Sequence, residues 1–105
     1  MLLILEKAVE LVRRLRPYVR EIAKGDPELA KQLRNASKSI ALNLAEGSGC
    51  YGGRKRNHYR IALGSARETH YSIRIAQAEE LIGELDAETA DVLDHVSRVS
   101  TKLAR

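Results

Sequence analysis

Apolar side chains recur at alternating steps of four and three residues through the first stretch of the chain, from Leu2 to about Lys24. This spacing keeps the apolar residues on one face of an α-helix. The stripe comprises Ile4, Ala8, Leu11, Leu15, Tyr18 and Ile22. A second apolar row widens this stripe, as expected of a helix that packs between two neighbours or at a subunit interface. The second row comprises Leu5, Val9, Val12 and Val19. Pro17 lies inside the pattern, and we expect it to kink the helix or end its first part.

Three further helices are predicted from similar patterns and from the turn residues between them. Asp26 and Pro27 form an N-cap and first helical residue, and they open a helix from Pro27 to about Gly47. The third helix is expected over roughly Arg54 to Leu81, and Asp86 caps the fourth. The expected inward positions are Leu29, Leu33, Ala36, Ile40, Asn43 or Leu44, Gly47, Tyr59, Ala62, Leu63, Ala66, Ile73, Ala76, Leu93, Val96, Val99 and Leu103.

Composition favours the same all-α fold. The chain has 105 residues and contains no Phe and no Trp, so Leu, Ile, Val and Ala must form the interior. No alternating run of β-branched and aromatic residues is long enough to predict a strand. Because the connections are short, successive helices should be antiparallel. We therefore predict an antiparallel up-down four-helix bundle in which residues 1–105 form a single domain.

The sequence also suggests where the protein resides. The single cysteine, Cys50, excludes an intramolecular disulfide and fits a reducing compartment. The N-terminal apolar run is interrupted by Glu6, unlike the longer apolar core of a signal peptide. No apolar run approaches the roughly 18 residues of a membrane span. A soluble, cytoplasmic protein without a membrane partner is expected.

Charge is distributed unevenly along the chain. The segment from Arg13 to Arg60 carries twelve Lys and Arg residues and four acids, whereas Ile75 to Ser97 carries seven acids and no Lys or Arg. A basic surface of this kind attracts polyanions, and nucleic acid is the commonest polyanion in a cell. The alternative is that the charges only keep a small bundle soluble and attract neighbouring subunits. Aromatic residues for stacking on bases are few, with only Tyr51 and Tyr59 flanking the basic run.

A glycine-rich basic loop, GSGCYGGRKR, separates the second and third predicted helices. Its glycines match the letters of a dinucleotide-binding fingerprint, but a helix precedes them where that motif requires a strand. Bare amides, nearby cations and a helix N-terminus together favour an anion such as a nucleic-acid phosphate. The alternative is a plain connection between two helices. The candidate nucleic-acid-binding residues are Arg54, Lys55, Arg56, Arg60, Lys38 and Arg20.

A second group of polar residues is expected within the bundle. Asn43 and Glu46 lie at positions where an ordinary core would have leucine, and Glu68 belongs to the third helix near a patch of small residues. A partly buried carboxylate needs a partner, which Arg34 or Arg67 can supply. Paired carboxylates also serve acid/base chemistry or metal binding, but the Glu-x-x-His motif of di-iron bundles is absent. We interpret Arg34, Asn43, Glu46 and Glu68 as a structural network that fixes helix register or a subunit contact.

No arrangement of residues predicts catalysis. His58, His70 and His95 are far apart in sequence, and none has a second histidine four residues away. Cys50 has no histidine at helical spacing, and no Ser, His and Asp set can be assembled with any specificity. We therefore assign no catalytic residue, no metal and no cofactor, and we expect the protein not to be an enzyme.

The chain resembles the bacterial four-helix-bundle proteins encoded in intervening sequences of 23S rRNA genes. Their pattern, close to Q-L-R-R-A-x-x-S-I-x-x-N-I-A-E-G, is matched over Gln32 to Gly47, and A-x-G-S-x-x-E is matched over Ala62 to Glu68. Departures include Leu44 for isoleucine, Ala41 for a frequent proline, and a more glycine-rich loop. The resemblance implies a four-helix bundle that assembles into a homopentamer with a central channel. It implies no established catalytic activity, and the related accessory proteins of diversity-generating retroelements bind nucleic acid and a reverse transcriptase.

Two functional hypotheses follow. The first is a homo-oligomeric bundle that binds RNA or DNA through its basic surface. The second is a protein–protein adaptor in which the wide apolar stripe of the first helix binds a partner such as a polymerase.

Overall fold

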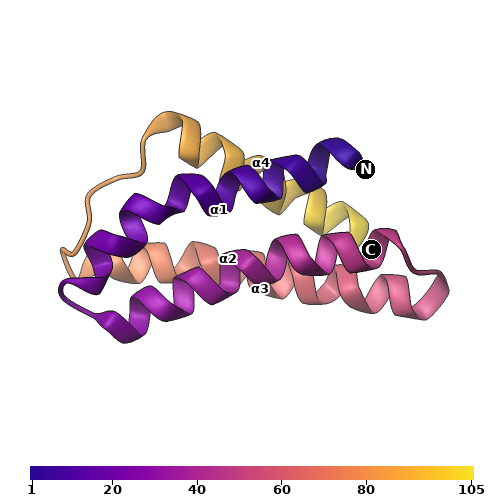
Figure 1. The fold of residues 1–105 in the computed structure, drawn as a ribbon, viewed down its shortest axis with the longest axis horizontal. Helices are drawn as coiled ribbons and strands as arrows, with labels where there is room; N and C mark the ends of the chain where they lie inside the picture. The colour runs from indigo at the N-terminus through magenta and orange to yellow at the C-terminus, as the bar shows by residue number, and fades with distance from the viewer.

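The computed structural model describes all residues from 1 to 105 and contains four α-helices and no strand. The helices are α1 (Leu2–Ala23), α2 (Pro27–Ser48), α3 (Gly52–Ala78) and α4 (Ala87–Leu103), and they run up and down along the long axis (Figure 1). The predicted all-α four-helix bundle is confirmed.

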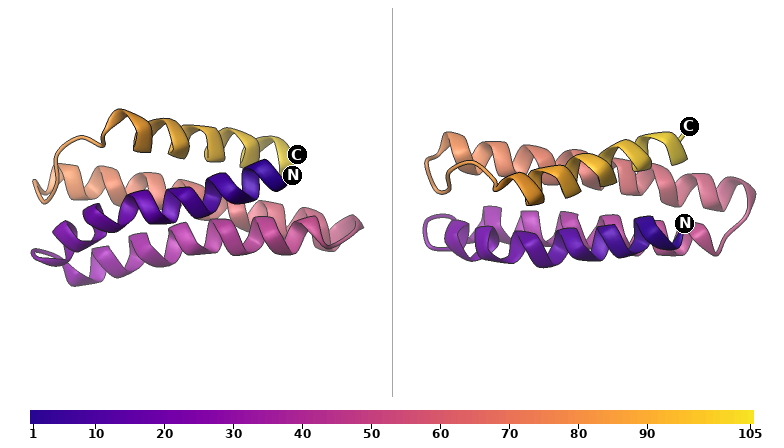
Figure 2. Two further views of the ribbon diagram at one scale, coloured as in Figure 1. Left: turned by 45° about the horizontal axis from the view of Figure 1, so that its top comes forward. Right: turned by 90° about the horizontal axis from the view of Figure 1, so that it is seen from above.

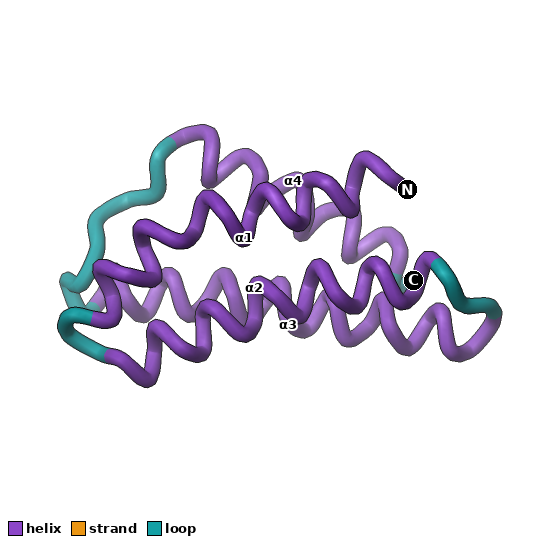
Figure 3. The backbone as a smooth tube through the Cα atoms, viewed as in Figure 1, coloured by secondary structure: helices purple, strands orange, loops and turns teal.

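The helices form a closed ring in which each packs against two neighbours. Helix α2 lies between α1 and α3, and α4 closes the ring by packing on both α3 and α1 (Figure 2). The most extensive contact joins α2 and α3. Two of the connections are tight turns, whereas the stretch between α3 and α4 crosses the end of the bundle (Figure 3). The α2–α3 loop therefore lies at one end, and the other two connections lie at the opposite end.

The predicted helix starts are confirmed at two N-caps. The Asp26 carboxylate accepts the Leu29 backbone N–H at 3.0 Å, and Pro27 occupies the first turn of α2. The Asp86 carboxylate accepts the Thr89 N–H at 3.1 Å at the start of α4. Each cap satisfies a backbone donor that the helix itself leaves without a partner.

Other boundaries differ from the prediction. Helix α1 does not end at Pro17 but continues through it to Ala23. Pro17 is exposed, so the carbonyl that its missing N–H leaves free can bond to water. Helix α3 begins two residues earlier than expected, at Gly52, and ends three residues earlier, at Ala78. Its end is set at Glu80, which has a φ of 61° and turns the chain away.

The interior is one cluster of 18 buried apolar residues drawn from all four helices. The predicted stripe of α1 supplies Ile4, Ala8, Leu11, Leu15 and Ile22. In the second row of α1, however, Val9 is 55% exposed. Close helix approach is visible where α2 meets α3, because Gly47 lies directly against the Tyr59 ring.

Candidate nucleic-acid interface

The three basic residues that follow the glycine loop lie in the first turn of α3. Consecutive helical residues point about 100° apart, so Arg54, Lys55 and Arg56 cannot face one surface. The Lys55 ammonium lies 6.0 Å from the centre of the Tyr59 ring, at the range of a cation–π contact, and Lys55 is half-buried. Arg54 and Arg56 are exposed. The triplet is therefore a divergent group of cations and not a single phosphate clamp.

The glycine loop itself borders a cavity of about 530 Å³. Arg54 lines it, together with Gly49, Cys50 and Tyr51, but so does Glu46. A carboxylate in the same cavity opposes the binding of an anion beside Arg54. The loop is consequently a weaker anion site than its glycines and cations suggest from sequence.

A continuous basic stripe runs along α3 instead. Arg56, Arg60, Arg67 and Arg74 follow one another at steps of four, seven and seven residues. These steps are close to whole numbers of helical turns, so the four side chains share one side of the helix. All four are exposed, and none forms an ion pair within the chain. Arg56 and Arg60 are among the predicted nucleic-acid-binding residues, whereas Arg67 and Arg74 are not, although their seven-residue spacing from Arg60 is a signal in the sequence.

The other two predicted nucleic-acid-binding residues lie apart from this stripe. Lys38 is exposed in the middle of α2. Arg20 is exposed in the last turn of α1, at the end of the bundle opposite the α2–α3 loop (Figure 1). The six predicted cations therefore do not form one surface.

The predicted polar network is only partly present. Asn43 is half-buried, and its amide donates to the Ser39 carbonyl at 2.9 Å and to Ser39 Oγ at 3.1 Å. Its Oδ1 lies 3.0 Å from His58 Nδ1, and Ser65 Oγ donates to Ser39 Oγ at 2.7 Å. Because the Asn43 amide nitrogen is the donor to Ser39, its oxygen must accept, so in this contact His58 donates from Nδ1.

Arg34, Glu46 and Glu68 do not belong to this network. All three are exposed, and none makes a side-chain hydrogen bond or ion pair within the chain. The expectation that Glu46 occupies a core position was wrong, because the helix turns this side chain to solvent beside the buried Gly47. The pairing of His58 with Asn43 could not be predicted from the sequence, because it depends on the register of α3 against α2.

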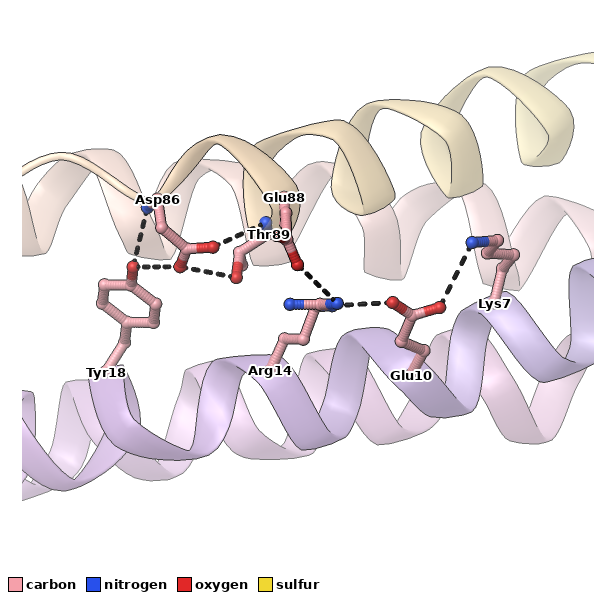
Figure 4. Close-up of polar contacts among 7 residues, drawn as sticks. All are labelled: Lys7, Glu10, Arg14, Tyr18, Asp86, Glu88 and Thr89. Carbon is pink, nitrogen blue, oxygen red and sulfur yellow. Dashed lines mark hydrogen bonds and ion pairs between the residues drawn. The ribbon is translucent and has the colours of Figure 1, made fainter.

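Cations on α1, in contrast, are partly neutralised by acids (Figure 4). Arg14 donates to Glu10 at 2.7 Å and forms an ion pair with Glu88 of α4 at 2.9 Å, while Lys7 lies 3.2 Å from Glu10. The hydrogen bonds from Arg14 and Lys7 lower the pKa of Glu10, and the hydrogen bond to Glu10 raises the pKa of Arg14. At this seam between α1 and α4, formed by Glu10, Arg14 and Glu88, the charged side chains pair with one another. The arginines of the α3 stripe have no such partners, so they can contact a ligand.

The same seam contains a second polar link, between Tyr18 and Asp86 (Figure 4). The Tyr18 hydroxyl donates to Asp86 Oδ1 at 2.6 Å and accepts the Asp86 N–H at 2.8 Å. Hydrogen bonds from Tyr18 and then from Thr89 lower the pKa of Asp86 to about 2. Burial, followed by the hydrogen bond to Asp86, raises the pKa of the Tyr18 phenol. The link therefore ties the start of α4 to α1.

None of the four helices combines the length and the hydropathy that a membrane span requires. No cluster of three or more His, Cys, Asp or Glu side chains gathers at spacing suited to a metal ion. The fold and the surface thus define a small all-α bundle protein that carries an unpaired basic stripe on one helix.

Comparison with known proteins identifies the family. The sequence model of the 23S rRNA-intervening sequence protein family matches residues 1–105, and the chain belongs to that family. A crystal structure of a protein of unknown function from the S23 ribosomal protein family of Bacteroides thetaiotaomicron is similar, with a TM-score of 0.68 and 22% identity over 96% of this chain and 91% of that one. That likeness supports the fold. No curated protein sequence matches the chain.

Proposed function

We propose that this protein is a non-enzymatic, homo-oligomeric helical bundle that binds RNA or DNA in the cytoplasm through its basic surface. The observation that carries the proposal is the stripe of Arg56, Arg60, Arg67 and Arg74, because these arginines are exposed and lack acidic partners. Seven residues along a helix span about 10 Å, so successive arginines reach different phosphates of one strand or groove. Copies within an oligomer multiply such weak contacts by avidity.

The salt dependence of binding tests this proposal. The purified protein is titrated against a labelled structured RNA and a matched DNA duplex at several salt concentrations. Changing Arg60, Arg67 and Arg74 together to Ala should reduce the slope of log K against log [salt] by about 2–3, since each lost phosphate contact removes about 0.9 on duplex DNA. The matched control changes Arg13, Arg16 and Arg20 of α1 to Ala, which removes three exposed charges away from the stripe.

The two triple variants separate a local contact from a general charge effect. Equal losses in both would contradict the stripe as the binding surface, and no binding by the wild-type protein at low salt would contradict the nucleic-acid function itself. A third variant, with Arg54, Lys55 and Arg56 changed to Ala, measures how much the cations next to the glycine loop contribute to the slope of log K against log [salt]. We expect this contribution to be smaller than that of the stripe, because only Arg56 of these three lies on it.

The outer face of the α2–α3 pair is the surface we assign to self-association. Leu42 is 63% exposed and Ile61 is 43% exposed. The contacts from Ser39 to Ser65 and from Asn43 to His58 set the register of the two helices, which brings Leu42 and Ile61 to the same level of the pair. Arg34, Glu46 and Glu68 lie on the same two helices without partners in the chain, and they supply charges of both signs for pairing between copies.

Light scattering after size exclusion tests this assignment. Leu42→Glu combined with Ile61→Glu should lower the oligomer mass, because two charges would be buried in an apolar contact. Val9→Glu on α1 is the control, since Val9 is similarly exposed at 55% but lies on another helix. An unchanged mass in the double variant would contradict the assignment. A wild-type monomer would contradict the homo-oligomer, which we expect from the family resemblance to be a pentamer.

An adaptor function is the second candidate, and the start of α1 favours it. Leu2 and Leu3 are 73% and 65% exposed, which is unusual for large apolar side chains at the start of a helix that faces a core elsewhere. This hypothesis predicts that a defined protein partner, such as a polymerase or reverse transcriptase, is retained after nuclease treatment. It also predicts that Leu2→Ser with Leu3→Ser releases that partner without changing nucleic-acid binding.

A further inference from the structure

A groove of about 600 Å³ lies between α3 and α4, on the side of α3 that carries the arginine stripe. Its floor is apolar and includes Ala66, Ile73 and Leu93, which belong to the core. Its α3 wall contains Arg67, Tyr71 and Arg74. The volume is within the usual range for sites that bind small molecules or single residues of a polymer.

The aromatic side chains of the α3 wall are placed for stacking. Tyr71 is 58% exposed although it borders the groove, and its ring meets the His70 ring edge-to-face, with centres 5.3 Å apart. The edge-to-face contact restrains the Tyr71 ring while leaving part of its surface free. A free aromatic face beside an apolar floor is the arrangement on which unpaired bases stack.

The two walls of the groove carry opposite charges, and this difference would orient a bound nucleotide. Arg67 and Arg74 are unpaired and lie about 10 Å apart along α3, a separation that suits two phosphates of one strand. The opposite wall contains Glu84 and Asp94, and Asp94 is already paired with Arg98. Carboxylates repel phosphates but accept hydrogen bonds from the N–H groups of bases. A nucleotide would therefore place its phosphate toward α3 and its base edge toward α4.

We propose that the α3–α4 groove binds unpaired nucleotides of a single-stranded nucleic acid, with Tyr71 stacking on a base and Arg67 and Arg74 contacting the flanking phosphates. This inference rests on the proposed nucleic-acid function and adds that the preferred substrate is single-stranded. A duplex keeps its bases stacked on one another, so it can use the arginines but not the ring or the apolar floor. An amphipathic helix fits less well, because a rim with cations on one side and carboxylates on the other leaves little apolar wall for it.

Fluorescence anisotropy with a labelled twelve-nucleotide oligouridine, the matching deoxyoligonucleotide and a duplex of the same length tests the proposal. Tyr71→Ala should weaken binding of both single strands about tenfold and leave duplex binding unchanged. Tyr71→Phe should retain wild-type binding, because stacking requires the ring and not the hydroxyl. The comparison variant is Tyr51→Ala, since Tyr51 is 90% exposed in the α2–α3 loop outside the groove, and it should weaken single-strand binding less than Tyr71→Ala does.

Photocrosslinking with 5-iodouridine in the same oligonucleotide gives a second, independent result. Trypsin separates the segment that contains Tyr71 (residues 68–74) from those that contain Tyr51 and Tyr59. We expect the crosslink on residues 68–74.

These measurements distinguish a failure of the groove proposal from a failure of the nucleic-acid-binding function. If wild type binds the duplex as tightly as the single strands, or if Tyr71→Ala leaves single-strand binding unchanged, the groove proposal is overturned while the nucleic-acid function stands. If wild type binds none of the three probes, both are overturned. A change in oligomer mass on Tyr71→Ala would assign the groove to a second copy of the chain and would also overturn the proposal.

Discussion

The contact between Gly47 and Tyr59 makes a quantitative prediction about the closeness of α2 and α3. A Cβ atom added at Gly47 would lie 2.6 Å and 2.8 Å from two carbons of the Tyr59 ring. The ring cannot move aside easily, because Tyr59 is only 3% exposed and belongs to the core cluster. Gly47→Ala should therefore push the two helices apart or force the ring out of its preferred rotamer.

The size of the effect follows from two opposing contributions. Overpacking a core by one methyl group costs about 1–3 kcal/mol of unfolding free energy. Replacing glycine by alanine inside a helix raises the unfolding free energy by up to about 1 kcal/mol, because alanine restricts the unfolded chain and favours the helix. Gly64→Ala provides the matched control, since Gly64 lies within α3, is exposed, and has no atom within 4 Å of an added Cβ.

Urea unfolding followed by circular dichroism at 222 nm measures the comparison at one fixed protein concentration. Gly64→Ala should be stabilised by up to about 1 kcal/mol, and Gly47→Ala should be less stable than Gly64→Ala by about 1–3 kcal/mol. In thermal melts the gap corresponds to roughly 4–8 °C for each kcal/mol. In a Tyr59→Leu background, Gly47→Ala should no longer be destabilising. Equal stabilities of Gly47→Ala and Gly64→Ala would refute the argument that the ring limits the approach of the two helices.

Three further predictions concern single polar groups. The Tyr59 hydroxyl is buried without a hydrogen-bond partner, so Tyr59→Phe should leave the unfolding free energy unchanged or raise it by about 1 kcal/mol, and a clear loss would show that the hydroxyl has a partner. Asn43→Ala should be less stable than the exposed control Asn35→Ala by about 0.5–1.5 kcal/mol in the same urea assay, because only Asn43 bonds to Ser39 and His58. The pKa of Asp86 is lowered to about 2, so its contribution to stability is present above the ordinary aspartate pKa near 4 and is lost as pH falls toward 2. Melting temperatures between pH 5 and pH 2 should therefore fall more steeply for wild type than for Asp86→Asn, and parallel curves would contradict this link.

The fold was predictable because local signals and packing agree. Asp26 and Asp86 cap the helices that their sequence context predicts, since an N-cap depends only on the three or four residues that follow it. The apolar stripe of α1 is buried as predicted except at Tyr18, which is half-buried. The termination at Glu80 was missed because a left-handed glutamate has no distinctive sequence signal.

The candidate site was less predictable, because it depends on how helices are rotated and aligned against each other. Asn43 bonds to Ser39 four residues earlier on the same helix, a contact that helical spacing allows, but the spacing could not supply His58 from another helix. It also could not decide that Glu46 faces solvent. The consecutive cations Arg54, Lys55 and Arg56 form a conspicuous run in the sequence, but on a helix their side chains point in different directions. The arginines at steps of seven residues, Arg67 and Arg74, share one side of the helix and were not predicted to bind nucleic acid.

The seam between α1 and α4 has a consequence for how the bundle assembles. Tyr18 and Asp86 are 68 residues apart in sequence, whereas α2 and α3 are joined by a short loop and share the most extensive contact. Closing a long segment of chain costs more entropy than closing a short one, so the α2–α3 hairpin should form early and the α1–α4 seam late. Substitutions at Tyr18 or Arg14 should then mainly accelerate unfolding, whereas substitutions at Gly47 or Tyr59 should mainly slow folding. The ring of helices would open first at the seam and keep its central hairpin longest.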